Sequence, residues 1–248
     1  MNIATFHFHG ALNFFLSRRQ KNKPVMQEFD RRASIKDMIE SIAPPHPEIA
    51  LIVVNGVSVG FDYIVQDGDV VDVYPDFDAV ELSNKVALIP PYPQRPKFIL
   101  DTHLGRLAAY LRMMGYDTLY RNDYPDDELA EVSHDETRIL LTRDVGLLKR
   151  NPVIYGYFVR EIHPRERLIE ISSRYGLVAD MQPFKHCMSC NGHLVSIEKA
   201  DLTGQVKETI LETYDLFHQC QSCEKIFWKG SHYVKMQALL EDVIAETS

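Results

Sequence analysis

The chain has 248 residues, of which 45% are hydrophobic and 25% charged, and this length allows one large domain or two to three small ones. Its formal net charge of −8 argues against a protein that binds nucleic acid through an overall basic surface, so any such contact has to be local. The charge does not exclude a nuclease, because carboxylates gathered around metal ions also make a chain acidic. Without an apolar run of about 18 residues or a secretory signal at MNIATFHFHG, we expect a cytoplasmic protein with no membrane contact.

Residues 1–78 are predicted to form a small α+β domain. Ser34, with Asp37 three residues later, is typical of a helix start, and Pro44-Pro45 ends the apolar helical pattern that follows. Asn55-Gly56 predicts a tight turn between strands. Two strands, one helix and then further strands is the order of a β-grasp, ubiquitin-like fold. The expected strands are 3–8, 25–29, 49–54 and 70–74, and the helix follows Ser34.

Within this domain, the phrase VNGVSV followed by DGDVVDVYP resembles the small sulfur carrier proteins of the ThiS and MoaD type. Those proteins end in a free Gly-Gly, whereas here Tyr74-Pro75 continues into more chain. Sulfur carriage is therefore not expected. A role as an adaptor that binds a protein partner, and a role as a folding or docking appendage, are both compatible with the sequence.

Residues 79–96 are predicted to be a linker, because Pro90, Pro91, Pro93 and Pro96 stand among few core residues. From Lys97 onward, apolar strand patterns alternate with helical patterns, which predicts a parallel sheet with helices on both sides. The expected strands are 98–100, 117–120, 138–142 and 153–159, and the expected helices are 103–114, 126–134, 145–150 and 164–175, with a closing amphipathic helix at 231–245.

Aspartates stand where the predicted parallel strands end. Asp101 ends the first strand, Asp123 lies just past the second, and Asp144 follows the third, while Asp126 and Asp127 open a helix. Sites in open parallel sheets form at the carboxyl ends of the strands, and carboxylate oxygens suit Mg²⁺ or Mn²⁺. We therefore treat all five as candidate catalytic residues, with Asp101 and Asp144 as the favoured metal ligands. The alternative is that these acids only cap and charge helix N-termini.

The four cysteines of the chain form two Cys-x-x-Cys pairs, Cys187 with Cys190 and Cys220 with Cys223. In a reducing compartment, two such pairs predict a four-thiolate zinc site rather than disulfides. The connection between the pairs is longer than usual, which leaves room for one or two β-hairpins. All four zinc positions would be filled by protein, so we expect this zinc to stabilise the fold and not to catalyse.

Taken together, FILDTHLGRLAAYLRMMGYDTLYRND, DDEL, RILLTRDVGLL, the paired cysteines and FWKGSHYVKM resemble the Mut-seven C-terminal RNase family. The resemblance covers residues 97 to about 240, and members with an N-terminal ubiquitin-like domain are part of this group. It implies a PIN-like nuclease domain at 97–183, followed by a zinc ribbon and C-terminal helix at 184–248. It also implies that Asp101, Asp144 and one of Asp123, Asp126 and Asp127 hold the catalytic metal.

Three basic residues near these acids are candidate phosphate ligands, namely Arg106, Arg143 and Lys149. Phe227-Trp228 could stack a base, although packing against the second cysteine pair is the simpler interpretation. The favoured hypothesis is a ribonuclease that hydrolyses RNA with Mg²⁺ or Mn²⁺. The alternative is a non-catalytic RNA-binding or adaptor protein that uses the zinc ribbon and the β-grasp domain.

Overall fold

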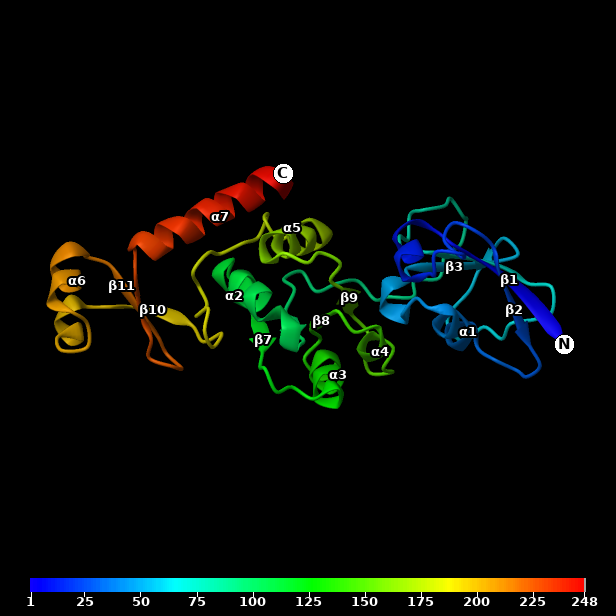
Figure 1. The fold of residues 1–248 in the computed structure, drawn as a ribbon, viewed down its shortest axis with the longest axis horizontal. Helices are drawn as coiled ribbons and strands as arrows, with labels where there is room; N and C mark the ends of the chain where they lie inside the picture. The colour runs from blue at the N-terminus through cyan, green and yellow to red at the C-terminus, as the bar shows by residue number, and fades with distance from the viewer. Residues whose placement is uncertain (248) are drawn as a thin grey trace. The chain divides into compact units, whose positions relative to one another are not determined.

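The computed structural model describes residues 1–247, which form two compact units (Figure 1). The first unit consists of Met1–Tyr92 and Asp126–Phe158, and the second of Pro93–Pro125 and the described residues from Val159 onward. Both units mix helices with strands, as the sequence predicts. In the described part of the chain, no helix is long and apolar enough to cross a membrane.

The N-terminal part of the first unit is a five-stranded sheet with one α-helix. Its strands follow the order β2-β1-β5-β3-β4, with β1 antiparallel to β2 and parallel to β5. The predicted β-grasp fold is therefore confirmed. The core includes Phe6, Ile39 and Ile52, all fully buried. The elements are β1 (Asn2–Phe8), β2 (Val25–Phe29), α1 (Ile35–Ile42), β3 (Leu51–Val54), β4 (Val57–Ser58) and β5 (Val70–Tyr74).

Local sequence signals explain the ends of these elements. Ser34 Oγ accepts the Asp37 N–H at 3.1 Å, which is the predicted cap of α1. Asn55 and Gly56 have φ angles of 50° and 85°, the left-handed pair that a two-residue hairpin turn requires. Two 3-10 helices, η1 (Gly10–Phe15) and η2 (His46–Glu48), are not expected from the sequence.

The first unit also contains two parallel strands with helices before and after the first of them. β8 pairs in parallel with β9, and all seven of their residues are buried. The observed β9 is shorter than the predicted strand 153–159. The elements are α3 (Asp126–Asp135), β8 (Ile139–Thr142), α4 (Val145–Leu148) and β9 (Gly156–Phe158).

Side chains of η2 join the ubiquitin-like fold to β9 and the loop before it. Glu48 Oε1 accepts the Phe158 N–H at 2.8 Å, and His46 Nε2 lies 2.7 Å from the Val153 carbonyl oxygen. The other ring nitrogen of His46 lies 2.7 Å from Glu40 Oε1, and the Lys149 ammonium donates to the Glu40 carbonyl at 2.5 Å. The ubiquitin-like fold is thus attached by buried polar contacts and not only by its linker.

The first part of the second unit has a parallel pair of strands, β6 and β7, and three helical segments. The predicted helix 103–114 is divided into a 3-10 turn and an α-helix. The α-helix ends at Met113, and the chain leaves it through Gly115. The φ of 91° and the close approach to the Gln182 carbonyl require glycine at this position. The elements are β6 (Phe98–Leu100), η3 (Thr102–Leu104), α2 (Gly105–Met113), β7 (Thr118–Tyr120) and α5 (Pro164–Tyr175).

The C-terminal part of the second unit is a ribbon of three antiparallel strands in the order β10-β11-β12. β10 and β11 form the expected hairpin, but the connection between them also holds η4 and α6, which accounts for the long spacing between the cysteine pairs. The elements are β10 (Leu194–Ile197), η4 (Lys199–Leu202), α6 (Glu208–Thr213), β11 (Phe217–Cys220), β12 (Ile226–Trp228) and α7 (Ser231–Thr247).

Helix α7 runs from the ribbon along α5, as Figure 1 shows in red beside yellow-green. Leu240 and Val243 of α7 are buried. Arg165 on α5 pairs with Asp242 at 3.7 Å and with Glu246. These contacts fix the C-terminal half of α7 and leave its first turns beside α2 and the ribbon.

Candidate metal centre and nuclease site

The two cysteine pairs lie in two loops with the same backbone conformation and the same hydrogen bond. Four residues after the first cysteine of each pair, Asn191 and Glu224 have φ angles of 73° and 59°. Each of them donates its N–H to the carbonyl of that cysteine, Asn191 to Cys187 at 2.8 Å and Glu224 to Cys220 at 2.9 Å. The repeated turn points both sulfurs of a pair toward the other pair.

All four cysteine sulfurs lie within 4.8 Å of one another. Cys187 Sγ is 3.7 Å from Cys223 Sγ, and Cys190 Sγ is 3.4 Å from Cys220 Sγ. Four sulfurs bound tetrahedrally at about 2.3 Å from zinc lie about 3.8 Å apart, so the cluster is compatible with structural zinc. The predicted four-cysteine metal site is therefore supported by geometry.

The electrostatics of the cluster favour a bound cation. Burial raises the pKa of the Cys187 thiol, and burial also raises the pKa of Cys190. Burial acts against ionisation of Cys220 as well, but N–H groups of Cys223 and Ser222 outweigh it and lower the pKa of Cys220. Cys220 is thus favoured for ionisation over Cys187 and Cys190. A divalent cation, when bound, would supply the positive charge that stabilises the thiolate ligands.

Three polar side chains fasten the first cysteine loop to β7, a role that was not expected from the sequence. The buried Arg112 of α2 donates to the Thr118 carbonyl at 2.9 Å and to the carbonyls of Met188 and Ser189, each at 3.1 Å. Asn191 accepts the Thr118 N–H at 2.9 Å and donates to Asp117 at 2.6 Å. The first cysteine loop and the start of strand β7 are therefore one hydrogen-bonded assembly.

Asp101 stands directly after β6 in the second unit. Its Oδ1 accepts the Thr102 N–H at 2.5 Å and so begins η3. Tyr120, at the end of the neighbouring parallel strand, donates to the Thr102 carbonyl at 2.7 Å. Burial and then the charge of Asp101 raise the pKa of the Tyr120 phenol. The tyrosine is a neighbour of Asp101 that sequence reasoning missed, because nothing in its local pattern distinguishes it from a core residue.

Asp123 follows β7 in the same unit and is an exposed carboxylate, with 85% of its side-chain surface accessible. It pairs with Arg121 at 3.3 Å, and the Arg121 guanidinium lies 4.0 Å from the centre of the Tyr124 ring. A surface pair of this kind contributes little to stability, so the carboxylate is available to other cations.

Asp144 lies two residues after β8 in the first unit. Its Oδ1 accepts the Gly146 N–H at 2.6 Å and the Leu147 N–H at 3.3 Å, which makes it the N-cap of α4. Thr142 Oγ1 accepts the Asp144 N–H at 2.9 Å. The capping role that the sequence offered as an alternative is therefore real. It occupies one carboxylate oxygen and leaves the other for a second ligand.

Asp126 and Asp127 open α3 in the first unit, and both pair with Arg150. The Arg150–Asp126 distance is 3.7 Å, and Asp127 is in closer contact. These two acids therefore have a cation supplied by the protein itself. This pairing was not expected from the sequence, since Arg150 lies 23 residues after Asp127.

The three basic candidates differ in their surroundings. Arg106 of α2 is exposed. Arg143 lies with its guanidinium carbon 5.8 Å from the centre of the Phe158 ring. Lys149 donates to the Glu40 carbonyl, and burial lowers the pKa of its ammonium. Lys149 therefore has a structural partner in the ubiquitin-like fold, which weakens the prediction that it binds phosphate.

The fold and the site define a modular α/β protein, with a β-grasp domain before the parallel strands and a four-cysteine ribbon after them. The family model described as the Mut7-C RNAse domain matches residues 96–240, more than half of the chain, and the Mut7-C ubiquitin model matches residues 1–81. The chain therefore belongs to the Mut7-C family, as its motifs indicate. Neither the comparison with curated proteins nor that with solved structures gives a match.

Proposed function

We propose that this protein is a metal-dependent ribonuclease. The observation that carries the proposal is that Asp101 directly follows β6 and Asp144 lies two residues after β8, each strand belonging to a parallel pair, and that both carboxylates are at least partly open to solvent. Membership of the Mut7-C family, whose model is described as an RNAse domain, supports the same class of reaction. We also propose that the chain is divided as the sequence predicts. The four segments are a ubiquitin-like domain at 1–78, a linker at 79–96, a nuclease domain at 97–183, and a zinc ribbon with its C-terminal helix at 184–248.

The proposed catalytic ions are Mg²⁺ or Mn²⁺, and the carboxylate donor set suits both. Asp101 and Asp144 would hold them together with a further acid. Asp123, Asp126 and Asp127 each pair with an arginine at the surface, and Asp123 is favoured because its side chain is the most exposed of the three, at 85% against 48% and 78%. When bound, such ions activate water and stabilise the charge of a phosphodiester in hydrolysis. The guanidinium groups of Arg106 and Arg143 would hold the phosphate oxygens of RNA.

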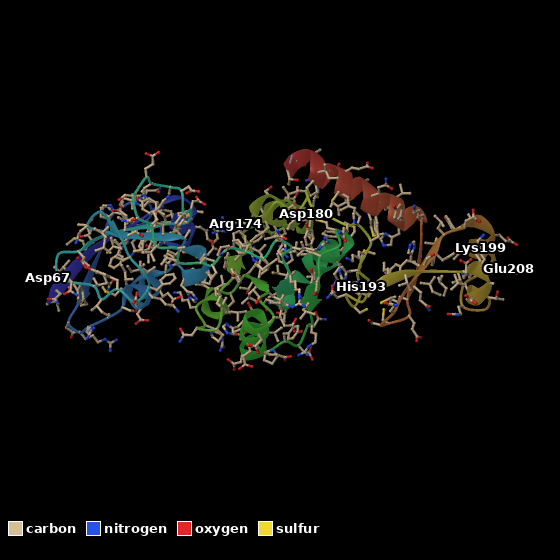
Figure 2. The ribbon with its side chains drawn as sticks, turned by 180° about the vertical axis from the view of Figure 1, so that it is seen from behind. Asp67, Arg174, Asp180, His193, Lys199 and Glu208 are labelled. Atoms are coloured by element: carbon tan, nitrogen blue, oxygen red, sulfur yellow. The ribbon has the colours of Figure 1, made fainter. Side chains whose placement is uncertain are left out.

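The test is cleavage of end-labelled RNA with Mn²⁺ by the wild type, Asp101→Asn and Asp144→Asn. We expect each variant to lose activity by on the order of 100-fold, because even residues that only orient a metal ligand cost 10–100-fold when they are changed. Asp180→Asn, at an exposed acid of the second unit (labelled in Figure 2), is the matched control and should keep full activity. Wild-type protein that never cleaves, or two variants as active as the control, would overturn the proposal.

A second candidate function is that of a non-catalytic RNA-binding or adaptor protein. It is favoured by the structural roles of the acids, since Asp144 caps α4 and Arg150 holds Asp126 and Asp127. In either case the ubiquitin-like domain is a possible site for a protein partner, and β2, at the edge of its sheet, carries an exposed Met26. We further propose a cytoplasmic location, where thiols stay reduced and able to hold metal.

A further inference from the structure

A groove of about 520 Å³ lies between α2, the N-terminal half of α7 and the first cysteine loop, all within the second unit. Arg106, Tyr110, His232 and Lys235 line it, and Ala109, Met188, Met236 and Leu239 complete its walls. The α7 residues recur at positions 232, 235, 236 and 239, so one face of the helix forms one wall.

The groove is basic in a chain that is acidic overall. Its lining contains no aspartate or glutamate, and in the described chain the side chains of Arg106, His232 and Lys235 make no hydrogen bond or ion pair. The acidic residues of α7 lie near its other end, where Asp242 and Glu246 pair with Arg165. The basic side chains of α7 that line the groove therefore lie in its first turns, and its acidic side chains lie toward its other end.

One end of the groove lies at the proposed catalytic edge. Gly105, which lines the groove, is five positions before Tyr110 and four after Asp101. A Cβ on Gly105 would lie 2.6 Å from the Tyr120 hydroxyl oxygen, so the absence of a side chain lets Tyr120 close against the start of α2. Tyr120 in turn contacts Thr102, the residue after Asp101. The groove thus begins next to a proposed metal ligand.

The other end of the groove continues into an aromatic cavity of about 290 Å³ on the ribbon, and Met188 and Met236 line both. Phe184 and Tyr233 lie there with ring centres 4.7 Å apart, and Phe227, Trp228 and Lys229 complete this side. The volume is close to the lower end of small-ligand pockets, roughly 300 Å³. Flat aromatic walls beside a cation suit an unpaired base with its phosphate.

We propose that the groove and the cavity together form a binding track for single-stranded RNA, with phosphates on Arg106, His232 and Lys235 and a base against Phe227, Trp228 and Tyr233. The proposal rests on the proposed ribonuclease function for the choice of RNA, and it adds the strand form and the path of the substrate. A base inside a duplex is stacked and cannot enter the cavity, so the track selects single strands.

The experiment measures binding without cleavage. Fluorescence anisotropy of a 5′-labelled twelve-residue oligouridylate is followed with full-length protein and no added Mg²⁺ or Mn²⁺, at several salt concentrations. The test variants are Arg106→Gln with Lys235→Gln, and Trp228→Leu with Tyr233→Leu. The control, Arg18→Gln with Lys207→Gln, removes the same charge from exposed positions; Lys207 adjoins Glu208, at the end of the ribbon away from His193 (Figure 2).

We expect the first variant to weaken binding at least tenfold at low salt and to lower the slope of log affinity against log salt by about 1.4, the value for two phosphate contacts on a single strand. The aromatic variant should weaken binding about fivefold or more at every salt concentration. Zinc content and urea unfolding are measured for each variant. If the aromatic variant misfolds, the test rests on the variant with Arg106→Gln and Lys235→Gln, which alters only exposed side chains.

Equal loss in the control, or no loss in the first variant, would overturn the track. So would equal or tighter binding of a twelve-base-pair RNA duplex, and so would competition by polyglutamate as effective as by RNA, which would identify an acidic protein partner. The two proposals can fail separately. If the protein binds RNA through the track but never cleaves it with Mn²⁺, the proposed nuclease function is wrong and the track stands. If the first variant cleaves RNA as well as the wild type does, the track is wrong and the nuclease function stands.

Discussion

The four cysteines and the five strand-end aspartates are both candidate metal ligands, yet only the cysteines are brought together within one small part of the fold. The cysteines come from one small ribbon, and their sulfurs lie within 4.8 Å of one another. The aspartates are divided between two units, with Asp101 and Asp123 in one and Asp126, Asp127 and Asp144 in the other. Each aspartate has its own cap or ion pair as a local partner.

The difference shows why one prediction of a metal site was confirmed at the level of geometry and the other remains a proposal. A thiol has few alternative uses in a reduced protein, so four clustered thiols fit a metal site. A carboxylate also caps helices and pairs with arginine, and those roles accompany or replace metal binding. The following changes test this contrast.

The largest effect is expected at the four-cysteine cluster. Cys220→Ser would remove one ligand of the expected zinc, and bound zinc contributes on the order of 10 kcal/mol of folding free energy in isolated zinc modules. We expect loss of the bound metal, measured by elemental analysis, and loss of ordered structure at residues 184–230, measured by hydrogen exchange. Ser189→Ala, between the ligands of the first pair, should change neither quantity. Full zinc content in Cys220→Ser would show that three cysteines suffice.

Next in size is the connection between the metal site and β7. Arg112→Met leaves the carbonyls of Thr118, Met188 and Ser189 without their donor, and we expect a loss of about 3 kcal/mol in the free energy of unfolding. Arg112→Lys keeps the charge but not the forked geometry and should recover only part of the loss. Urea unfolding measures both, and Arg106→Met, an exposed arginine of the same helix, should lose less than about 0.5 kcal/mol.

A smaller effect is expected where an acid has a purely structural partner. Glu48→Ala leaves the buried Phe158 N–H without an acceptor, so we expect a loss of about 1–3 kcal/mol in the stability of the first unit. Glu48→Gln keeps an oxygen acceptor and should retain most of that stability. Glu28→Ala, at an exposed position of β2, is the control. No change in urea unfolding for Glu48→Ala would contradict the attachment of the ubiquitin-like fold through η2.

The smallest effect concerns the two acids that Arg150 holds. Because the pairs with Asp126 and Asp127 are on the surface, Arg150→Gln should change stability by less than about 1 kcal/mol. It should also leave unchanged the Mn²⁺ concentration that gives half-maximal cleavage. A shift of that concentration to lower values would place Asp126 or Asp127 among the metal ligands in preference to Asp123.

Much of the local structure could be predicted from residue patterns. The Ser34 cap, the Asn55-Gly56 turn, the glycine at 115 and the helix at 164–175 follow from rules that act over a few residues. The 3-10 helix His46–Glu48 and the helix Glu208–Thr213 were missed, because short segments have weak periodicity and depend on what they pack against. The length of β9 was overestimated for the same reason.

The sequence by itself determined the order of the elements, the β-grasp domain, the two cysteine pairs and the positions of the aspartates after their strands. These features depend on spacing along the chain. Only the tertiary structure decided the partners: Arg112 for the cysteine loop, Arg150 for Asp126 and Asp127, Glu40 for Lys149, and α7 as a wall of the groove. Hydrogen bonds, ion pairs and grooves join residues far apart in sequence, so packing alone brings them within reach of one another.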